Sequence, residues 1–387
     1  KHDMTFTLAL RRSIIDALLP AVLPDDLNLS FTTLPQYYDG QARVDWRLDR
    51  QNRLTAFALA SFDRLSLFSA NENELDPNLA GQFDAATDFA LASTTWQHQT
   101  PAFDSKLVAR WTRLFSEQSF GVGNFVRFTV KGLGGREDLV LRPHPRARVR
   151  AGAEAFWLHS NILANVPLPP QEGSPMLPNF TLDPVAAIDA KNNDLYAAAY
   201  AAADLQASRR LSVTPGVRVD RFQRTHATTI SPRLAASLDL GRGTTARASV
   251  GRYTRPLFGA EYVRNDLKPE KAIHYVVGVE DKVTEGVTAS VAGFYNDLGD
   301  LVVQDRSLVV DDALQAYINR GTGRAIGAEV GVRVRRAGFF GWLSYTASRA
   351  TRDDQNGMGS RLFDYDQTHN LILVGSYKWR SWSFGGR

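Results

Sequence analysis

The chain has 387 residues, of which 44% are hydrophobic and 22% charged, as in an ordinary folded protein. The net charge of +4 is small for this length and no Lys/Arg-rich block is present, so we expect no nucleic-acid partner. The lack of cysteine excludes disulfides, thiol catalysis and cysteine-ligated zinc. No stretch approaches ~18 consecutive apolar residues, which excludes a membrane-spanning helix.

Both ends of the chain have the alternating pattern of β-strands. The chain begins with KHDMTFTLALRRS, where apolar and polar residues alternate, and it closes with SWSFGGR, which also has a strand pattern. No signal peptide precedes the first strand, and no turn or tail follows the last one. We therefore expect the chain to be an internal piece of a longer protein.

Most segments between the ends alternate with a period of two, which predicts strands rather than helices. The polar faces of 42–48, 211–222 and 327–336 carry Arg43, Asp45, Arg47, Arg218, Asp220, Glu329, Arg333 and Arg335. The predicted strands cover more than half of the chain, well above the ~20–25% of soluble proteins. There are about 17 of them, at 3–17, 36–48, 52–63, 83–98, 104–118, 123–143, 146–160, 192–207, 210–224, 228–241, 244–256, 271–283, 287–303, 316–336, 339–352, 364–378 and 381–387.

The connections between these strands alternate between short and long. Membrane β-barrels have tight periplasmic turns and longer extracellular loops, so the alternation favours that architecture. Two connections, 119–122 and 225–227, are short where the rule requires long ones. The long connections lie at 18–35, 64–82, 161–191, 256–270, 304–315 and 353–363.

The two faces of the strands differ in composition. The apolar face is rich in Ala, Val and Leu, which are too small to fill the interior of so long a sheet. Small apolar residues facing lipid and charged residues lining a wet or plugged lumen satisfy both faces. We therefore predict one all-β domain over 1–387, a transmembrane antiparallel β-barrel with the eight charges above facing its lumen. These charges either form ladders that solvate the wall or grip a plug, or they line a substrate path. A large soluble all-β protein such as a propeller is the alternative, but no blade-length repeat is present.

Several short patterns resemble reactive sites without meeting their requirements. GTGRAIG (321–327) is followed by a strand instead of the helix of a dinucleotide loop, and KGLGGRED (131–138) lacks the final Lys-Ser/Thr of a phosphate loop. NENELD (71–76) and TRDDQNG (351–357) match no EF-hand loop. The histidines lie in no recognisable Ser-His-Asp motif. We predict no catalytic residue, no metal site and no cofactor.

The stretch RLFDYDQTHN (361–370) has the composition of a metal or acid–base site. Interpreted as a strand, it places Asp364 and Asp366 on one face and His369 on the other, so Asp366 and His369 point apart. We expect these side chains to tie the outer end of a strand to its neighbours.

Recognition is expected in the long loops, which carry binding residues more often than walls do. The segment RPLFGAEYVRND (255–266) offers aromatic, cationic and amide groups, and its candidate ligand-binding residues are Phe258, Tyr262, Arg264 and Asn265. A second loop, PLPPQEGSPMLPNF (167–180), is rich in proline and ends at Phe180.

Several stretches, taken in order, resemble the barrel domain of TonB-dependent outer-membrane receptors. An earlier hairpin of the same kind is YDGQARVDWRLDRQNRLTAFALASFD (38–63). The others cover about 210–380 and are TPGVRVDRF, ISPRLAASLDL, TTARASVGRYTRP, NDLKPEKAIHYVVGVE, VTASVAGFYNDLGDLVV, YINRGTGRAIGAEVGVRVR, GWLSYTASRATR and FDYDQTHNLILVGSYKW.

The resemblance implies a Gram-negative outer-membrane barrel of about 22 strands, filled by an N-terminal plug and coupled to the TonB system. This chain contains no plug of the expected length, no TonB-binding segment and no terminal strand that ends in an aromatic residue. The implied function is uptake of a scarce ligand such as a siderophore, vitamin or glycan. Two alternatives remain: a structural anchor or interaction platform with lipoprotein or surface-complex partners, and a passive porin of ~16–18 strands.

Overall fold

The computed structural model describes residues 3–22, 29–69, 81–121, 123–167, 185–257, 266–304, 317–355 and 357–387. Eighteen strands form one sheet, and the only helix of these ranges is α1 (Ile15–Val22). That helix is too short and not apolar enough to cross a membrane. The predicted all-β class is therefore confirmed. The strands are β1 (Asp3–Arg12), β2 (Leu29–Arg47), β3 (Asn52–Ser69), β4 (Gly81–Gln99), β5 (Phe103–Phe120), β6 (Asn124–His144), β7 (Ala147–Pro167), β8 (Val185–Gln206), β9 (Leu211–Phe222), β10 (Ala227–Gly241), β11 (Thr244–Arg255), β12 (Glu270–Thr284), β13 (Val287–Gln304), β14 (Tyr317–Arg336), β15 (Phe339–Asp353), β16 (Arg361–Leu362), β17 (His369–Trp379) and β18 (Trp382–Gly386).

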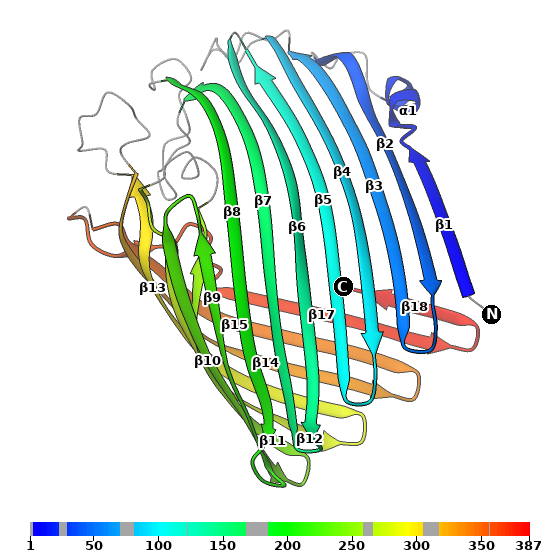
Figure 1. The fold of residues 1–387 in the computed structure, drawn as a ribbon, viewed down its shortest axis with the longest axis vertical. Helices are drawn as coiled ribbons and strands as arrows, with labels where there is room; N and C mark the ends of the chain where they lie inside the picture. Colours follow the sequence, from blue (N-terminus) through cyan, green and yellow to red (C-terminus); the bar gives the residue numbers. More distant parts are fainter. Residues whose placement is uncertain are drawn as a thin grey trace.

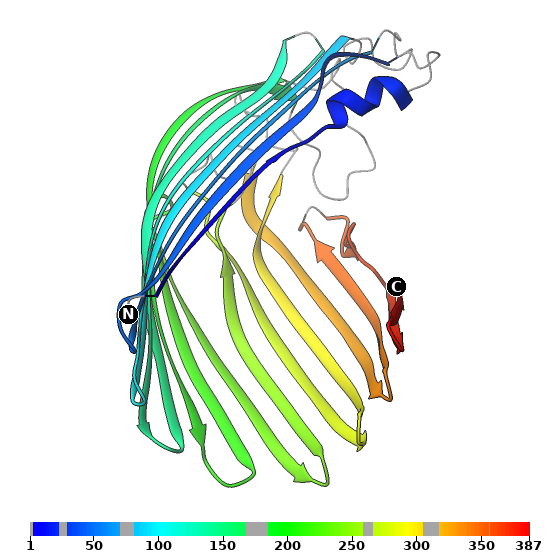
Figure 2. The same ribbon diagram turned by 90° about the vertical axis from the view of Figure 1, so that its right-hand side faces the viewer.

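The strands form an antiparallel meander in which each strand pairs with the next one along the chain. The one departure is at β15, which pairs with both the two-residue β16 and β17. The sheet curls strongly, with β1 along one edge and β18 near the other (Figure 2). No pairing joins β1 to β18 in the described residues, so the curled sheet is open along this seam.

The connections are sorted by length between the two ends of the sheet, as predicted. One end carries eight connections of two to four residues, and the strand ends that flank the long connections lie at the opposite end (Figure 1). Arg242–Gly243 and Ala337–Gly338 close two of the short turns with positive φ at both residues (56° and 94°, 48° and 80°). This is the type I′ geometry, whose twist matches that of the flanking strands. The two exceptions noted in the sequence, near 121–123 and 223–226, are indeed short connections at the loop end.

The register places all eight predicted lumen charges on one face of the sheet. Side chains directly opposite each other on paired strands project to the same side. One row of such partners runs from β2 to β9 through Asp45, Thr55, Thr95, Val108, Arg136, Glu154, Ala198 and Asp220. A second row connects β10 to β14 through Arg233, Gly251, His274, Asn296 and Ala325, on the same face as Glu329.

The opposite face is apolar and uncovered. On β1, for example, Met4, Phe6, Leu8 and Leu10 are all between 56% and 77% exposed. Few large apolar side chains are buried anywhere in the described ranges, so the sheet has no conventional core. A continuous apolar surface of this extent is not found on soluble monomers, and lipid is the solvent that suits it.

The first strand is shorter than predicted because a helix replaces its end. The alternation of 3–12 stops at Ser13, whose hydroxyl accepts a hydrogen bond from the Ile15 N–H at 3.2 Å, as an N-cap residue does. The next strand, β2, starts at Leu29 instead of residue 36. The one described strand that the sequence did not predict is β16, because two residues are too few to show a period.

Candidate functional site

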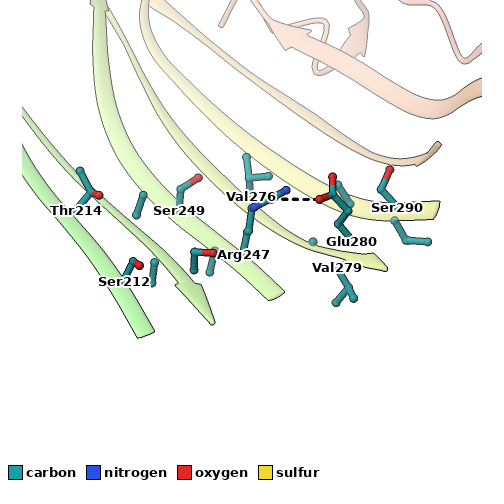
Figure 3. A pocket seen from close by; sticks show the side chains of 15 residues that line it. Ser212, Thr214, Arg247, Ser249, Val276, Val279, Glu280 and Ser290 are labelled. Carbon is teal, nitrogen blue, oxygen red and sulfur yellow. Dashed lines mark hydrogen bonds and ion pairs between the residues drawn. The ribbon is translucent and has the colours of Figure 1, made fainter. Parts of the chain in front are cut away.

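The polar face is the concave face of the curled sheet. In Figure 3, Arg247 and Glu280 approach each other on the side of β11 and β12 that faces the opposite wall, whereas Val279 points away from that wall. The guanidinium of Arg247 lies 3.3 Å from the Glu280 carboxylate. We therefore call this side the concave face and the apolar side the convex face.

Four neighbouring strands, β6 to β9, carry the densest group of interacting charges on the concave face. We call Arg136, Asp138, Glu154, Tyr196, Tyr200, Arg218 and Asp220 the β6–β9 ion network. Arg218 is central: its Nε lies 2.9 Å from Asp220 Oδ1, and its Nη2 contacts both Glu154 and the Tyr196 hydroxyl. Tyr196 in turn donates a hydrogen bond of 2.7 Å to Asp220.

The second half of the network bridges strands that are not adjacent. Arg136 binds Asp138 at 2.8 Å and lies 3.6 Å from Glu154, which links it to Arg218. The Tyr200 hydroxyl reaches from β8 to Asp138 on β6 at 2.5 Å. Lys106 stands directly opposite Asp138 on β5. Three carboxylates thus face three cations, so the network neutralises itself and stiffens the wall, as a fully satisfied polar network does.

The other predicted charges form two separate groups. Asp45 accepts hydrogen bonds from Arg43 at 2.5 Å, from Arg53 at 2.9 Å and from Thr55 at 2.8 Å. Arg47 lies 3.8 Å from Asp3 on β1.

The third group lies on β14. Glu329 accepts a hydrogen bond from Ser344 at 3.1 Å. Arg333 and Arg335 have no ion pair within the described ranges, and Arg335 lies over the Phe340 ring at 5.9 Å. The eight predicted charges therefore share a face but do not converge on one binding site.

The predicted ligand residues Phe258, Tyr262, Arg264 and Asn265 lie outside the described residues. The two ends of their loop, however, are described. Leu257 and Leu267 are buried (8% and 3% exposed) and pack with Val302 of β13 in a small apolar cluster.

We call the apolar cluster of Leu257, Leu267 and Val302 the loop base. Ion pairs lie around it. Arg255 binds Glu270 at 2.6 Å, and the other Glu270 oxygen accepts the Val302 N–H at 2.8 Å. From β15, the nearly buried Arg352 donates to the Val302 carbonyl at 2.6 Å and pairs with Asp354 at 2.8 Å. Apolar packing thus joins both described ends of the loop to Val302 of β13, and Glu270 and Arg352 hold the backbone of Val302 in place.

The stretch 361–370 is not a strand as predicted, because residues 363–368 turn and β17 begins only at His369. The turn is stabilised by Asp366, which accepts the Ala350 N–H of β15 at 2.6 Å and the Thr368 hydroxyl at 2.7 Å. The backbone donor holds the pKa of Asp366 below its usual range. His369 instead contacts the Tyr345 hydroxyl at 2.8 Å. The expected role in tying this strand end to its neighbour is confirmed, and its physical basis is a turn.

No group of three or more His, Asp or Glu side chains in the described part of the chain is placed to hold a metal ion. Sequence reasoning missed the importance of Arg136, Asp138 and Glu154. The alternation of polar and apolar residues in REDL (136–139) and AEAF (153–156) places these charges on one face of their strands. Only the register shows that they meet the side chains of β8 and β9.

One known protein family matches almost the whole chain. The family described as TonB dependent receptor-like, beta-barrel matches residues 15–387. No curated protein sequence matches the chain.

Solved structures with the same fold include outer-membrane receptors. The siderophore receptor PirA of Acinetobacter baumannii aligns with a TM-score of 0.69 at 15% identity, covering 90% of this chain and 57% of that one. The ferric-catecholate import receptor Fiu of Escherichia coli K12 aligns at 0.67 and 16% identity (99% and 66%), and the E. coli outer-membrane transporter YddB at 0.65 and 11% (97% and 61%). The chain therefore spans about three fifths of their length. Its match over nearly the whole chain shows that it belongs to the β-barrel family of TonB-dependent receptors, proteins of the Gram-negative outer membrane.

Proposed function

We propose that this chain forms the wall and the loop supports of a TonB-dependent receptor that imports a scarce ligand across the outer membrane. The observation that carries the proposal is the family match over residues 15–387. Ion pairing on the concave face supports it, because a charged, hydrated lumen is what a polar solute or a polar plug needs. The TonB system would be the energy-supplying partner, engaged through a plug.

The ligand class is proposed from chemistry at the loop end. Phe258, Tyr262, Arg264 and Asn265 combine aromatic surface with a fixed positive charge, which suits an anionic aromatic ligand. The fixed loop base at Leu257 and Leu267 would hold them above the lumen. The printed names of similar structures, a siderophore receptor and a ferric-catecholate import receptor, make ferric catecholates the first class to test ahead of vitamins and glycans.

Uptake of radiolabelled ferric catecholate in whole cells tests the proposal. Cells that produce the protein should accumulate iron when TonB is present, and the quadruple alanine variant of the four loop residues should lose most of this uptake. The matched control replaces four short-turn residues, Arg50, Gln51, Arg209 and Arg210, with alanine, and it should retain uptake.

The uptake experiment, together with measurements of channel conductance and of co-purifying proteins, separates the alternatives. Uptake that is independent of TonB and accompanied by channel conductance would indicate a passive porin. Lack of uptake of any ligand class, together with co-purification of a lipoprotein or another surface component, would indicate a structural anchor. Either result would overturn the import proposal.

A further inference from the structure

A single carboxylate lies in the middle of the lipid-facing band on β5 to β8, which are side by side in Figure 1. Glu137 of β6 stands directly opposite Leu107 of β5 and Ala153 of β7. Leu107 is 44% exposed on the convex face, whereas Arg136, the chain neighbour of Glu137, belongs to the concave ion network. Successive residues of a strand point to opposite faces, so Glu137 projects toward lipid.

The depth of Glu137 follows from the side chains that limit the apolar band. Two rows of directly opposed residues form these limits, an outer row of Trp111, Leu133 and Trp157 and an inner row of Phe103, Leu141 and Val149. Tryptophan is enriched where the hydrocarbon meets the headgroups, so the outer row marks the interface. Glu137 is four residues from Leu133 and four from Leu141. Four residues of a strand tilted by about 45° rise about 9 Å, so the carboxylate lies near the middle of the membrane.

The chain itself satisfies this carboxylate only in part. The Ser105 hydroxyl of β5 donates a hydrogen bond of 2.5 Å to Glu137 Oε1, and no cation of the described residues forms an ion pair with Glu137. A carboxyl group has room for further hydrogen bonds, and lipid tails offer no donor. An ionisable side chain at this depth is costly, so it indicates a partner inside the membrane.

A second copy of this chain offers the required group at the required depth. Copies in one membrane have the same orientation, so a twofold axis along the membrane normal brings identical residues together at the same height. Two Glu137 carboxyl groups that hold one proton between them form a strong O–H···O hydrogen bond, and the low dielectric of the lipid strengthens it. An unrelated partner would need a donor placed independently at this depth.

The side chains beside Glu137 are complementary to those of a second copy. When the twofold axis passes through Glu137, β5 of one copy faces β7 of the other. The exposed Leu107 projects from β5, whereas β7 presents only Ala151, Ala153 and Ala155 between its two limiting rows. A large side chain therefore meets small ones on both sides of the axis, and small residues let membrane segments approach closely.

The surface of small residues is wide enough for a dimer. From β3 to β8 the outward positions in the middle of the band are mostly alanine or glycine, for example Ala58, Ala92 and Ala199, whereas β12 and β13 carry Val277 and Val291 there. Five strand spacings of about 4.8 Å and a band about 25 Å tall give roughly 600 Å² per copy, close to the ~800 Å² of a standard interface.

We propose that two copies of this chain pair side by side in the outer membrane through β5 to β7, with their Glu137 carboxyl groups hydrogen-bonded across the twofold axis. The Ser105 hydroxyl of each copy holds its carboxyl group in position. The interface is on the convex face, so it does not depend on the proposed import function.

Single-cysteine variants test this interface, because the native chain has no cysteine. In phospholipid vesicles with a low protein-to-lipid ratio, a short bismaleimide should couple two copies of Ala153→Cys, directly opposite Glu137. The matched control, Val277→Cys, is 62% exposed in the middle of β12 and should stay uncoupled. Heat-modifiable migration on gels confirms that each variant is folded before the reagent is added.

Substitutions of Glu137 in the Ala153→Cys protein test the hydrogen bond itself. Glu137→Leu should weaken association by roughly three- to tenfold, as expected for hydrogen bonds between membrane segments, whereas Glu137→Gln should retain it because an amide both donates and accepts. Glu137→Lys should not couple to itself, but it should couple to copies that keep Glu137, because a cation then meets a carboxylate.

Three results would overturn the proposal. The first is equal coupling of Ala153→Cys and Val277→Cys, and the second is unchanged coupling in Glu137→Leu. The third is a mixture of Glu137 and Glu137→Lys copies that couples no better than Glu137→Lys alone.

Discussion

Replacing Asp220 with alanine tests whether the β6–β9 ion network stabilises the wall. The carboxylate is 5% exposed and accepts hydrogen bonds from Arg218 at 2.9 Å and from Tyr196 at 2.7 Å. Asp220→Ala removes the acceptor for both donors at once. Arg218 keeps its contact with Glu154, so the guanidinium does not lose every partner.

The expected cost follows from the burial of these groups. A hydrogen bond to a charged group contributes about 1.5–3 kcal/mol, and the Arg218 side chain is 21% exposed, so water replaces only part of the loss. We expect Asp220→Ala to lower the free energy of unfolding by about 2–3 kcal/mol. The matched control is Asp204→Ala, which breaks the more exposed pair with Arg150 (37% and 45% exposed). That variant should lose less than about 1 kcal/mol.

Urea-induced unfolding of the protein refolded into phospholipid bilayers, monitored by tryptophan fluorescence, measures both values. The double variant with Arg218→Leu should recover part of the stability lost in Asp220→Ala, because it removes the cation that was left underpaired. If Asp220→Ala and Asp204→Ala have the same unfolding free energy, the concave-face network is a solvated surface and the reasoning is wrong.

Three further predictions concern the turns and the loop base. Gly286 has φ 84°, and an added Cβ would lie 2.2 Å from the Arg335 carbonyl, so Gly286→Ala should cost about 1–3 kcal/mol in the same unfolding assay, whereas Gly375→Ala, with open space around it, should be close to neutral. Leu267→Ala should destabilise the loop base by about 2–3 kcal/mol because the side chain is 3% exposed, and Met358→Ala, at a side chain that is 83% exposed, should leave stability unchanged. Asp366 has a lowered pKa, so its stabilisation of the 363–368 turn is present above the ordinary value of about 3.9 and is lost as the pH falls through its folded-state pKa. Amide exchange at Ala350 should therefore accelerate in strong acid in the native protein, whereas in Asp366→Ala, which lacks the acceptor, it should be fast at neutral pH as well.

The alternation of polar and apolar residues, together with the lengths of the connections, was sufficient to predict the architecture from the sequence. A strand shows its two faces through a period of two, so Arg43, Arg218 and Glu329 could be assigned to one polar face before any pairing was known. Sorting of connections by length then indicated which end of the sheet carries the loops. Both signals are local and repeat many times along the chain, so errors in single elements such as 3–17 did not change the result.

Interactions between strands could not be predicted in the same way. Arg218 and Glu154 are 64 residues apart, and their contact depends on the combined register of β7, β8 and β9. The turn at Asp366 also escaped prediction, because alternation of short polar and aromatic residues is compatible with a strand until the Ala350 N–H is known to lie within reach.

The role of a charged side chain in this wall depends on the face of the sheet to which it projects. On β6, Lys131 and Arg136 are five residues apart, an odd number, so they project to opposite faces. Arg136 joins the β6–β9 ion network on the concave side, whereas Lys131 lies directly opposite Arg113 and His159 on the convex side. A slip of one residue in the register of β6 would turn Arg136 and Asp138 toward lipid and leave Glu154 without a cation on this strand. The paired charges therefore act as a check on register as well as a lining.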